Sequence, residues 1–225
     1  MPLKLHHLNA SRSQRLVWLI EEIGVPCEIM HHQRHPETSL APEVLLEVHP
    51  MGKSPLLEDD GIVIAETGAI AEYLLAKYDA DHKLHPPVNS EDFPRYLEWV
   101  HSAEGAVFLP GLLTFYLNMA GLGESDLAQR MAPEVAKAVM HIEGHLAKHA
   151  YFAGDTFSAA DCLMGFQIQS LEAAGALGMM PKTAAWLESV RQRPAYQRMI
   201  EIGIQAKSRD HPCLLYTSPS PRDRG

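Results

Sequence analysis

The sequence has few of the features expected of a secreted, nucleic-acid-binding or membrane protein. Its three cysteines, Cys27, Cys162 and Cys213, are far apart and form no C-x-x-C pair, which argues against a disulfide framework or a paired-cysteine zinc site. The net charge is −9 and there is no basic run, which argues against a nucleic-acid partner. No apolar stretch is long enough to span a bilayer, and residues 1–15 lack a signal-peptide pattern. We therefore expect a cytoplasmic protein that binds neither nucleic acid nor membrane.

The first 80 residues alternate between strand and helix patterns. Apolar residues at 3–8 and 27–31 predict two strands around a helix at 16–23, which Gly24 and Pro26 end. A short helix near 42–48, a hairpin at 56–65 and a helix from 66 to about 78 follow. This order, βαβ and then ββα, is that of a thioredoxin-like domain, which we place at residues 1–80.

The remainder of the chain has helical patterns. Residues 81–89, with two consecutive prolines, are predicted to be a linker. Beyond it, helical spacing predicts five segments near 90–119, 125–149, 158–174, 183–192 and 194–206, hence an all-α bundle over residues 90–210. Ser158 and Asp161 are spaced as a capping pair within it. Residues 211–225 have no periodicity, and we interpret them as a non-native or disordered tail.

Four short motifs resemble those of the cytosolic glutathione transferases, in order along about residues 3–205. They are SRSQRL at 11–16, HPMGKSPLL at 49–57, ET at 66–67 and FSAAD at 157–161. The second is similar to a bacterial and fungal branch, here with a serine in the catalytic turn. His49 and Ser54 depart from the Asn and Val usual in this motif. The resemblance implies a thioredoxin-like domain that holds glutathione, an all-α domain that shapes a pocket for a small electrophile, and a homodimer. It implies no cofactor, with glutathione as co-substrate.

The resemblance assigns activation of the glutathione thiol to Ser11, with Arg12 beside it. A free thiol has a pKa of about 8.5, and lowering it by two units requires roughly 2.7 kcal/mol. A hydroxyl that donates to the thiolate contributes about 1.5–3 kcal/mol, and a helix N-terminus roughly 0.3–1 kcal/mol. Alternatively, Ser11 is a helix cap and Arg12 a solvated surface charge. Ser13 is interpreted as a plain cap.

By the same resemblance, Lys53, Ser54, Pro55, Glu66 and Thr67 bind glutathione. Pro55 is expected to be cis, which would point the Ser54 backbone at the cysteinyl part of the peptide. The helix that begins at Thr67 offers N–H groups to the γ-glutamyl carboxylate, Glu66 pairs with its ammonium group, and Lys53 contacts the glycyl carboxylate. The alternatives are a strand-edge proline, a helix cap and an exposed lysine.

Two further groups of residues stand out. Phe108, Phe115 and Tyr116 are candidates for the electrophile pocket, although aromatic stripes at helical spacing also form cores. Three histidines recur at i, i+4 and i+8 on one helix face, at positions 141, 145 and 149. They do not form an H-E-x-x-H motif, and no carboxylate or cysteine is placed to complete a site, so no bound metal is expected.

The function predicted from these observations is conjugation of glutathione to small electrophiles by a glutathione S-transferase. One alternative is a glutathione-dependent peroxidase or disulfide reductase, because the same thiolate could perform either reaction. Another is a non-catalytic interaction module. The presence of Ser11, Pro55, Glu66 and Thr67 argues against that module, because a retired site has no need of them.

Overall fold

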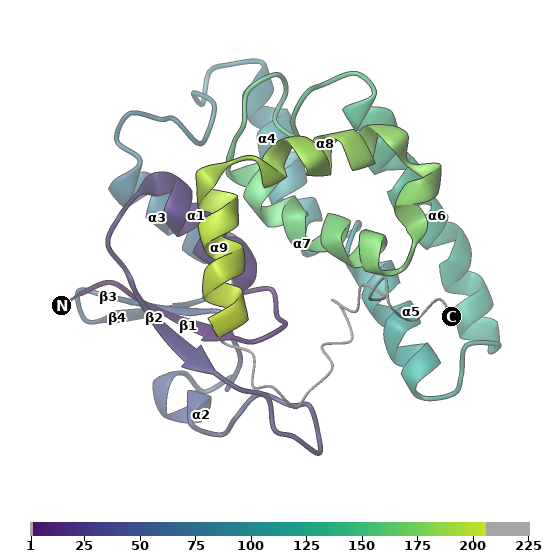
Figure 1. Ribbon diagram of the computed structural model, residues 1–225, viewed down its shortest axis with the longest axis horizontal. Coiled ribbons are helices and arrows are strands. Elements are labelled where there is room, and N and C mark those ends of the chain that lie inside the picture. Colours follow the sequence, from purple (N-terminus) through teal and green to yellow (C-terminus); the bar gives the residue numbers. More distant parts are fainter. Residues whose placement is uncertain (1, 206–225) are drawn as a thin grey trace, which may run out of the picture.

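The computed structural model describes residues 2–205; the predicted tail at 211–225 lies outside the described residues. A four-stranded sheet and its helices form one half of the molecule, and a helical bundle forms the other (Figure 1). The elements are β1 Lys4–Leu8, α1 Gln14–Ile23, β2 Glu28–His32, α2 Leu45–Val48, β3 Leu56–Asp59, β4 Ile62–Ala65, α3 Thr67–Tyr78, α4 Asp92–Ser102, α5 Leu109–Met119, α6 Asp126–Leu146, α7 Ala159–Ala173, the 3₁₀ helix η1 Ala176–Met179, α8 Pro181–Arg191 and α9 Pro194–Gln205. The fold class predicted from the sequence is confirmed.

The sheet has the strand order β2-β1-β3-β4, in which β1 and β2 are parallel and the remaining pairs are antiparallel. The β3–β4 hairpin closes through Asp60 and Gly61, both with positive φ, the conformation that lets a two-residue turn match the twist of its strands. Helix α1 ends at Gly24 in the left-handed region, as its sequence predicted. Helices α1 and α3 lie together on one side of the strands (Figure 1).

The two halves share one hydrophobic core. Helix α1 packs against α7 and α9, so α9 returns from the bundle to the sheet domain (Figure 1). Trp18 of α1 is buried and lies edge-on to Tyr196, with ring centroids 4.9 Å apart. Gly165 lets α7 lie close to the Trp18 ring of α1, because a Cβ at this position would be only 2.7 Å from that ring. The guanidinium of Arg193 adds a bidentate ion pair to Glu22, at 2.6 and 2.8 Å.

One predicted segment differs from the structure. The predicted helix near 90–119 is two helices, α4 and α5, separated by turns from Ala103 to Phe108. Pro110 has no N–H to continue a helix through this point, and the Ala103 carbonyl accepts from Arg15 and Gln167. The predicted linker at 81–89 contains no helix or strand. It is nevertheless anchored to the bundle, since Leu84 is buried and its carbonyl accepts from Ala159 N–H at 2.7 Å.

Candidate functional site

The turn between β1 and α1 places Ser11 at the C-terminal end of β1. Ala10 takes a positive φ of 47°, and Ser11 follows with 7% of its surface exposed. The Ser11 Oγ lies 2.7 Å from the Ser13 Oγ and accepts the Ser13 backbone N–H at 3.3 Å. The first turn of the helix begins at once, since Gln14 N–H donates to the Ser11 carbonyl. Ser11 therefore lies beside a helix N-terminus, where a negative charge is stabilised.

Ser13 does not act as the plain helix cap that the sequence predicted. It occupies the N-cap position, but its hydroxyl makes no capping bond. The fully buried Ser13 Oγ instead lies 2.8 Å from His7 Nδ1. It is also within hydrogen-bond distance of the backbone N–H of Leu8, at 3.2 Å, and of the Leu8 carbonyl, at 3.3 Å. Its hydrogen bonds thus run back to β1, because the turn folds the serine over the end of that strand.

Arg34 holds the same turn from outside and was not singled out by sequence analysis. Its Nε and Nη2 atoms donate to the carbonyls of Asn9 and Ala10, at 3.2 and 3.1 Å, and its backbone N–H donates to Asn9 Oδ1 at 2.9 Å. These bonds satisfy carbonyls that the tight turn leaves without strand partners. No local motif marks Arg34, because its targets are about 25 residues earlier in the chain.

Arg12 and Arg15 meet on one carboxylate from the helical domain. Both Nη1 atoms donate to Glu104, with 2.8 Å between Arg15 Nη1 and Glu104 Oε1. Both guanidinium carbons also lie over the Phe108 ring, 5.3 and 5.5 Å from its centroid. The Arg12 side chain is 40% exposed but paired with Glu104, so its guanidinium lies at the boundary of the two domains. Glu104 is a second residue that sequence analysis did not identify.

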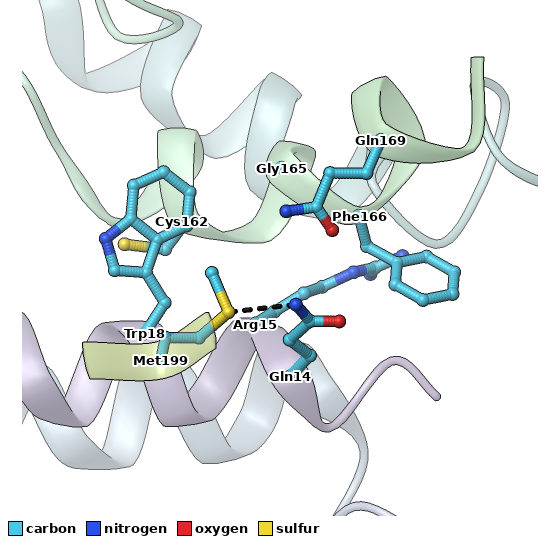
Figure 2. Close-up of a pocket in the computed structure, with 8 residues that line it drawn as sticks. All are labelled: Gln14, Arg15, Trp18, Cys162, Gly165, Phe166, Gln169 and Met199. Atoms are coloured by element: carbon cyan, nitrogen blue, oxygen red, sulfur yellow. Dashed lines mark hydrogen bonds between the residues drawn. The ribbon is translucent and has the colours of Figure 1, made fainter. Parts of the chain in front are cut away.

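Arg15 is almost fully buried, and burial lowers its pKa to about 10 although Glu104 opposes the shift. Behind it, between α1, α7 and α9, lies a cavity of about 10 Å³, close to the size of one water molecule (Figure 2). Gln14 reaches across the cavity to the sulfur of Met199, at 2.9 Å. This space is far too small for a substrate, so it is part of the interdomain packing.

The loop before β3 approaches the same end of β1. The Ser54–Pro55 bond is cis, as predicted. The side chain of Ser54 also contributes: its Oγ donates to the His6 carbonyl at 2.7 Å and accepts from Leu8 N–H at 3.2 Å. These bonds extend the pairing with β1 beyond Leu56, the first residue of β3, a role not foreseen for this departure from the family motif. Lys53 is exposed and forms no ion pair with another described residue.

Glu66 and Thr67 lie next to this loop, at the start of α3. Leu56 pairs with Ala65 across the hairpin, so the residues immediately beyond the pair are Pro55 and Glu66. Glu66 has φ 75° and ψ 126°, a strained conformation for a residue with a side chain, and makes no capping bond. Thr67 is buried, with 3% of its surface exposed. The first turn of α3, where the leading N–H groups of a helix have no partner within the helix, therefore begins beside the cis-proline loop.

The candidate electrophile residues are placed differently from one another. Phe108 packs against Arg12 and Phe166, which puts its half-buried ring beside the turn that carries Ser11. Phe115 lies two turns further along the same face of α5. Tyr116 is 58% exposed, and its ring centroid is 5.7 Å from that of Phe115. The structure thus brings Phe108 to the turn and leaves Phe115 and Tyr116 further out along α5.

The histidines of α6 belong to an aromatic cluster. His141 stacks on Trp99 at 4.6 Å between ring centroids, and His145 stacks on Phe152 at 5.9 Å. Within residues 2–205, no group of three or more His, Cys, Asp or Glu side chains is arranged to hold a metal ion. In the same part of the chain, no helix is long and apolar enough to cross a membrane.

The fold is that of a thioredoxin-like domain followed by an all-helical domain. Residues 1–76 match the family model of the glutathione S-transferase N-terminal domain, and residues 106–194 match that of the C-terminal domain. Glutathione S-transferase 3 of Schizosaccharomyces pombe is 32% identical over 206 residues, covering 85% of this chain and 84% of the relative. The crystal structure of a glutathione S-transferase from Actinobacillus pleuropneumoniae superposes with a TM-score of 0.81 at 30% identity, covering 95% of this chain and 99% of that one. The chain therefore belongs to the glutathione S-transferase family, and these matches support glutathione transferase function.

Proposed function

We propose that this protein conjugates glutathione to small electrophiles, with Ser11 as the residue that stabilises the thiolate. The observation that carries the proposal is the convergence of three features on one end of β1 and β3. These features are the Ser11 turn, the cis-proline loop at Ser54–Pro55 and the open N-terminus of α3 at Thr67. Together they offer a hydroxyl, an extended backbone edge and a carboxylate site, which are the groups that a thiol tripeptide requires.

Each part of glutathione has a proposed partner. The γ-glutamyl carboxylate binds the first-turn N–H groups of α3 and the Thr67 hydroxyl, and Glu66 pairs with the ammonium group. The Ser54 backbone pairs with the cysteinyl residue, and the exposed Lys53 contacts the glycyl carboxylate. The positive φ of Glu66 supports this assignment, because strained backbone persists where the surrounding structure imposes it, commonly at binding sites.

Arg12 contributes positive charge beside Ser11, and Phe108 forms the apolar wall on that side. The electrophile would then lie between the turn and α5, with Phe115 and Tyr116 further out. The bound glutathione thiolate could also reduce a peroxide or a disulfide, whereas a protein thiol is poorly suited to take part. Cys27, a described cysteine outside the turn, has its pKa raised to about 12 by burial, so it remains a neutral thiol near neutral pH.

Replacing Ser11 by alanine tests the proposal. Loss of one hydrogen bond to the thiolate, worth about 1.5–3 kcal/mol, should raise the pKa of bound glutathione by roughly 1–2 units. The thiolate absorbance of the complex, titrated against pH, measures this shift, while the affinity for glutathione should change little. Ser189→Ala is a matched control, because its hydroxyl donates to the carbonyl of Trp186 in its own helix, far along the chain from the turn that carries Ser11. An unchanged midpoint in Ser11→Ala would contradict the assignment.

Comparing reactions distinguishes the alternatives. Conjugation of an aromatic halide by the wild-type protein should exceed its reduction of an organic hydroperoxide or a glutathione mixed disulfide. Dominant reduction would support the peroxidase or reductase alternative. Failure to bind glutathione-agarose would support the non-catalytic module.

We also propose a cytoplasmic homodimer. The edge strand β4 exposes Ile62 and Val63, at 47% and 40%, and Met51 is 60% exposed in the loop before β3. Apolar side chains on an edge strand are suited to burial against a second copy. Light scattering on the purified protein measures the mass directly, and a monomer at micromolar concentration would contradict this proposal.

A further inference from the structure

Three side chains form a continuous row of hydrogen bonds from the sheet to the proposed catalytic hydroxyl. His7 Nδ1 lies 2.8 Å from Ser13 Oγ, and Ser13 Oγ lies 2.7 Å from Ser11 Oγ. All three residues are buried, and Ser13 has no exposed surface. Each bond is therefore shielded from water, where hydrogen bonds are stronger and polarise one another.

The protons in this row can be ordered in two directions. Each serine hydroxyl has one proton to donate and two lone pairs with which to accept. In one direction Ser11 donates to Ser13 and Ser13 donates to His7, so the Ser11 proton is used inside the protein. In the other direction His7 Nδ1–H donates to Ser13, Ser13 donates to Ser11, and the Ser11 proton is left to point outward.

The backbone contacts are compatible with the outward direction. Ser13 Oγ would then accept from His7 and from Leu8 N–H, which is 3.2 Å away. Its single proton would go to Ser11 Oγ at 2.7 Å, which is closer than the competing acceptor, the Leu8 carbonyl at 3.3 Å. Ser11 Oγ would accept from the hydroxyl and from the backbone N–H of Ser13, at 2.7 and 3.3 Å. With both of its lone pairs occupied, Ser11 could interact with a further group only as a donor. A thiolate is an acceptor, so this is the arrangement that the proposed function requires.

We propose that His7, with its proton on Nδ1, is a positioning residue that directs the Ser13 and Ser11 hydroxyls outward, so that Ser11 donates to the glutathione thiolate. The inference rests on the proposed function and adds a role for a residue of β1. His7 acts through Ser13 and does not touch the substrate.

The surroundings of His7 support this tautomer. Its Nε2 atom is buried and has no hydrogen-bond partner among the described residues. A proton on Nε2 would leave a buried N–H unpaired, a rare and costly arrangement, whereas a proton on Nδ1 is shared with Ser13. Burial and the neighbouring rings of His31 and His32 lower the pKa of His7 to about 4, so the ring is neutral near pH 7.

Two substitutions of different chemistry test the proposal. In His7→Asn the side-chain NH₂ can occupy the position of Nδ1–H and donate to Ser13, whereas His7→Leu removes the donor. The thiolate absorbance of the glutathione complex should show a midpoint about one pH unit higher in His7→Leu. This shift is a roughly tenfold smaller thiolate fraction well below the midpoint. The midpoint in His7→Asn should stay near the wild-type value. kcat for conjugation should fall in parallel in His7→Leu, with little change in KM for glutathione.

Two further variants keep the test interpretable. Ser13→Ala interrupts the row at its middle and should raise the midpoint as His7→Leu does, which serves if His7→Leu does not fold. His6→Asn is the matched control, because His6 bonds Glu58 at 2.8 Å and His32 at 3.0 Å instead of the row. Its midpoint should equal that of the wild-type protein.

The outcomes separate this inference from the proposed function. A raised midpoint in Ser11→Ala together with a wild-type midpoint in His7→Leu and Ser13→Ala would overturn the role of His7 and leave Ser11 in place. An equal rise in His7→Asn and His7→Leu would also overturn it, since the donor would then have no effect. A wild-type complex with no thiolate absorbance would contradict the proposed function, and the inference with it.

Discussion

At the scale of single residues, the charge of Glu104 links the two domains. It pairs with Arg12 and with the buried Arg15, whose side chain has no exposed surface. Arg15 Nε and Nη2 have no hydrogen-bond partner among the described residues, so Glu104 is the carboxylate that compensates this charge. The neighbouring rings of Phe108 and Phe166 provide the rest of the surroundings, at 5.5 and 5.2 Å.

Glu104→Gln should therefore destabilise the protein strongly. Removing one partner of a buried ion pair costs about 3–5 kcal/mol, and the partly exposed Glu104 places the effect near the lower figure. The free energy of unfolding in urea measures the loss. Glu134→Gln is the control, because its pair with Lys137 is exposed and such pairs contribute about 0–1 kcal/mol. Equal losses in the two variants would contradict the role given to Glu104.

His7 should make stability depend on pH below neutrality. Its pKa is about 4 in the folded protein and 6.5 when unperturbed, so between these values the unfolded chain binds more protons. The neutral His7 ring contributes to the free energy of unfolding above pH 6.5, and this contribution is lost as the pH falls. The loss is about 2 kcal/mol between pH 7 and pH 5.

The comparison with His7→Asn isolates this effect. Asparagine does not titrate, so the difference in unfolding free energy between the two proteins should shift by that amount in favour of the variant at pH 5. Asp161 acts in the opposite direction, because burial raises its pKa to about 6, but it is present in both proteins. If the free energy of unfolding changed with pH in the same way in both proteins, the prediction would be refuted.

At the scale of elements, Asp161 joins three parts of the helical domain. The capping box with Ser158 is present, as the sequence predicted, with Ser158 N–H donating at 2.9 Å. The same carboxylate also accepts from Phe152 N–H at 3.2 Å and from Trp186 Nε1 at 3.0 Å. It therefore connects the start of α7 to the preceding loop and to α8, which no capping motif could reveal.

Asp161→Ala should accordingly cost more than a helix cap. Loss of the carboxylate leaves three buried N–H groups unpaired, and we expect a decrease of about 3–5 kcal/mol in the free energy of unfolding. A capping role alone predicts about 0.5–2 kcal/mol. Ser125→Ala provides the reference, since Ser125 caps α6 through one bond to Ala128 N–H. Turnover per folded molecule should stay near normal, and a loss no larger than that of Ser125→Ala would show that Asp161 is only a cap.

At the scale of the whole molecule, the sheet and the bundle are tied together through α1. Trp18 packs against Phe157 and Tyr196, with centroids 5.6 and 4.9 Å away, and donates to Glu22 at 2.9 Å. Glu22 in turn holds Arg193, whose guanidinium carbon is 3.6 Å from the Phe157 ring centroid. The inner face of α1 is thus buried by the helical domain as much as by the sheet.

The two halves should therefore unfold together. Separating the two halves would expose Trp18 and its partners to water. This exposure costs about 1.5–3 kcal/mol for each large apolar side chain, so a half-unfolded state is disfavoured. Thermal unfolding followed by tryptophan fluorescence and by far-ultraviolet circular dichroism should give one coincident transition. As a control, Gly165→Leu should weaken the interface and shift both signals together. Two resolved transitions in the wild-type protein would contradict a shared core.

The sequence alone determined the order of the elements and several of their ends. The hairpin turn at Asp60–Gly61, the end of α1 at Gly24 and the turn that carries Ser11 all follow from residues a few positions apart. Such features depend on local backbone preferences and on the spacing of apolar residues, which are visible in the printed chain. The fold class follows from their order.

Only the tertiary structure decided which polar groups meet. The pairing of Arg15 with Glu104 spans 89 residues, Arg34 reaches back 25 residues to Asn9, and Ser13 bonds His7 instead of capping its own helix. A buried donor or acceptor takes whichever partner the folded chain brings within about 3 Å, and distance along the sequence does not limit that choice. The physical reason is the same at the candidate site: packing of α1 against the sheet and the bundle sets where the side chains of Ser11, Arg12 and His7 lie relative to one another.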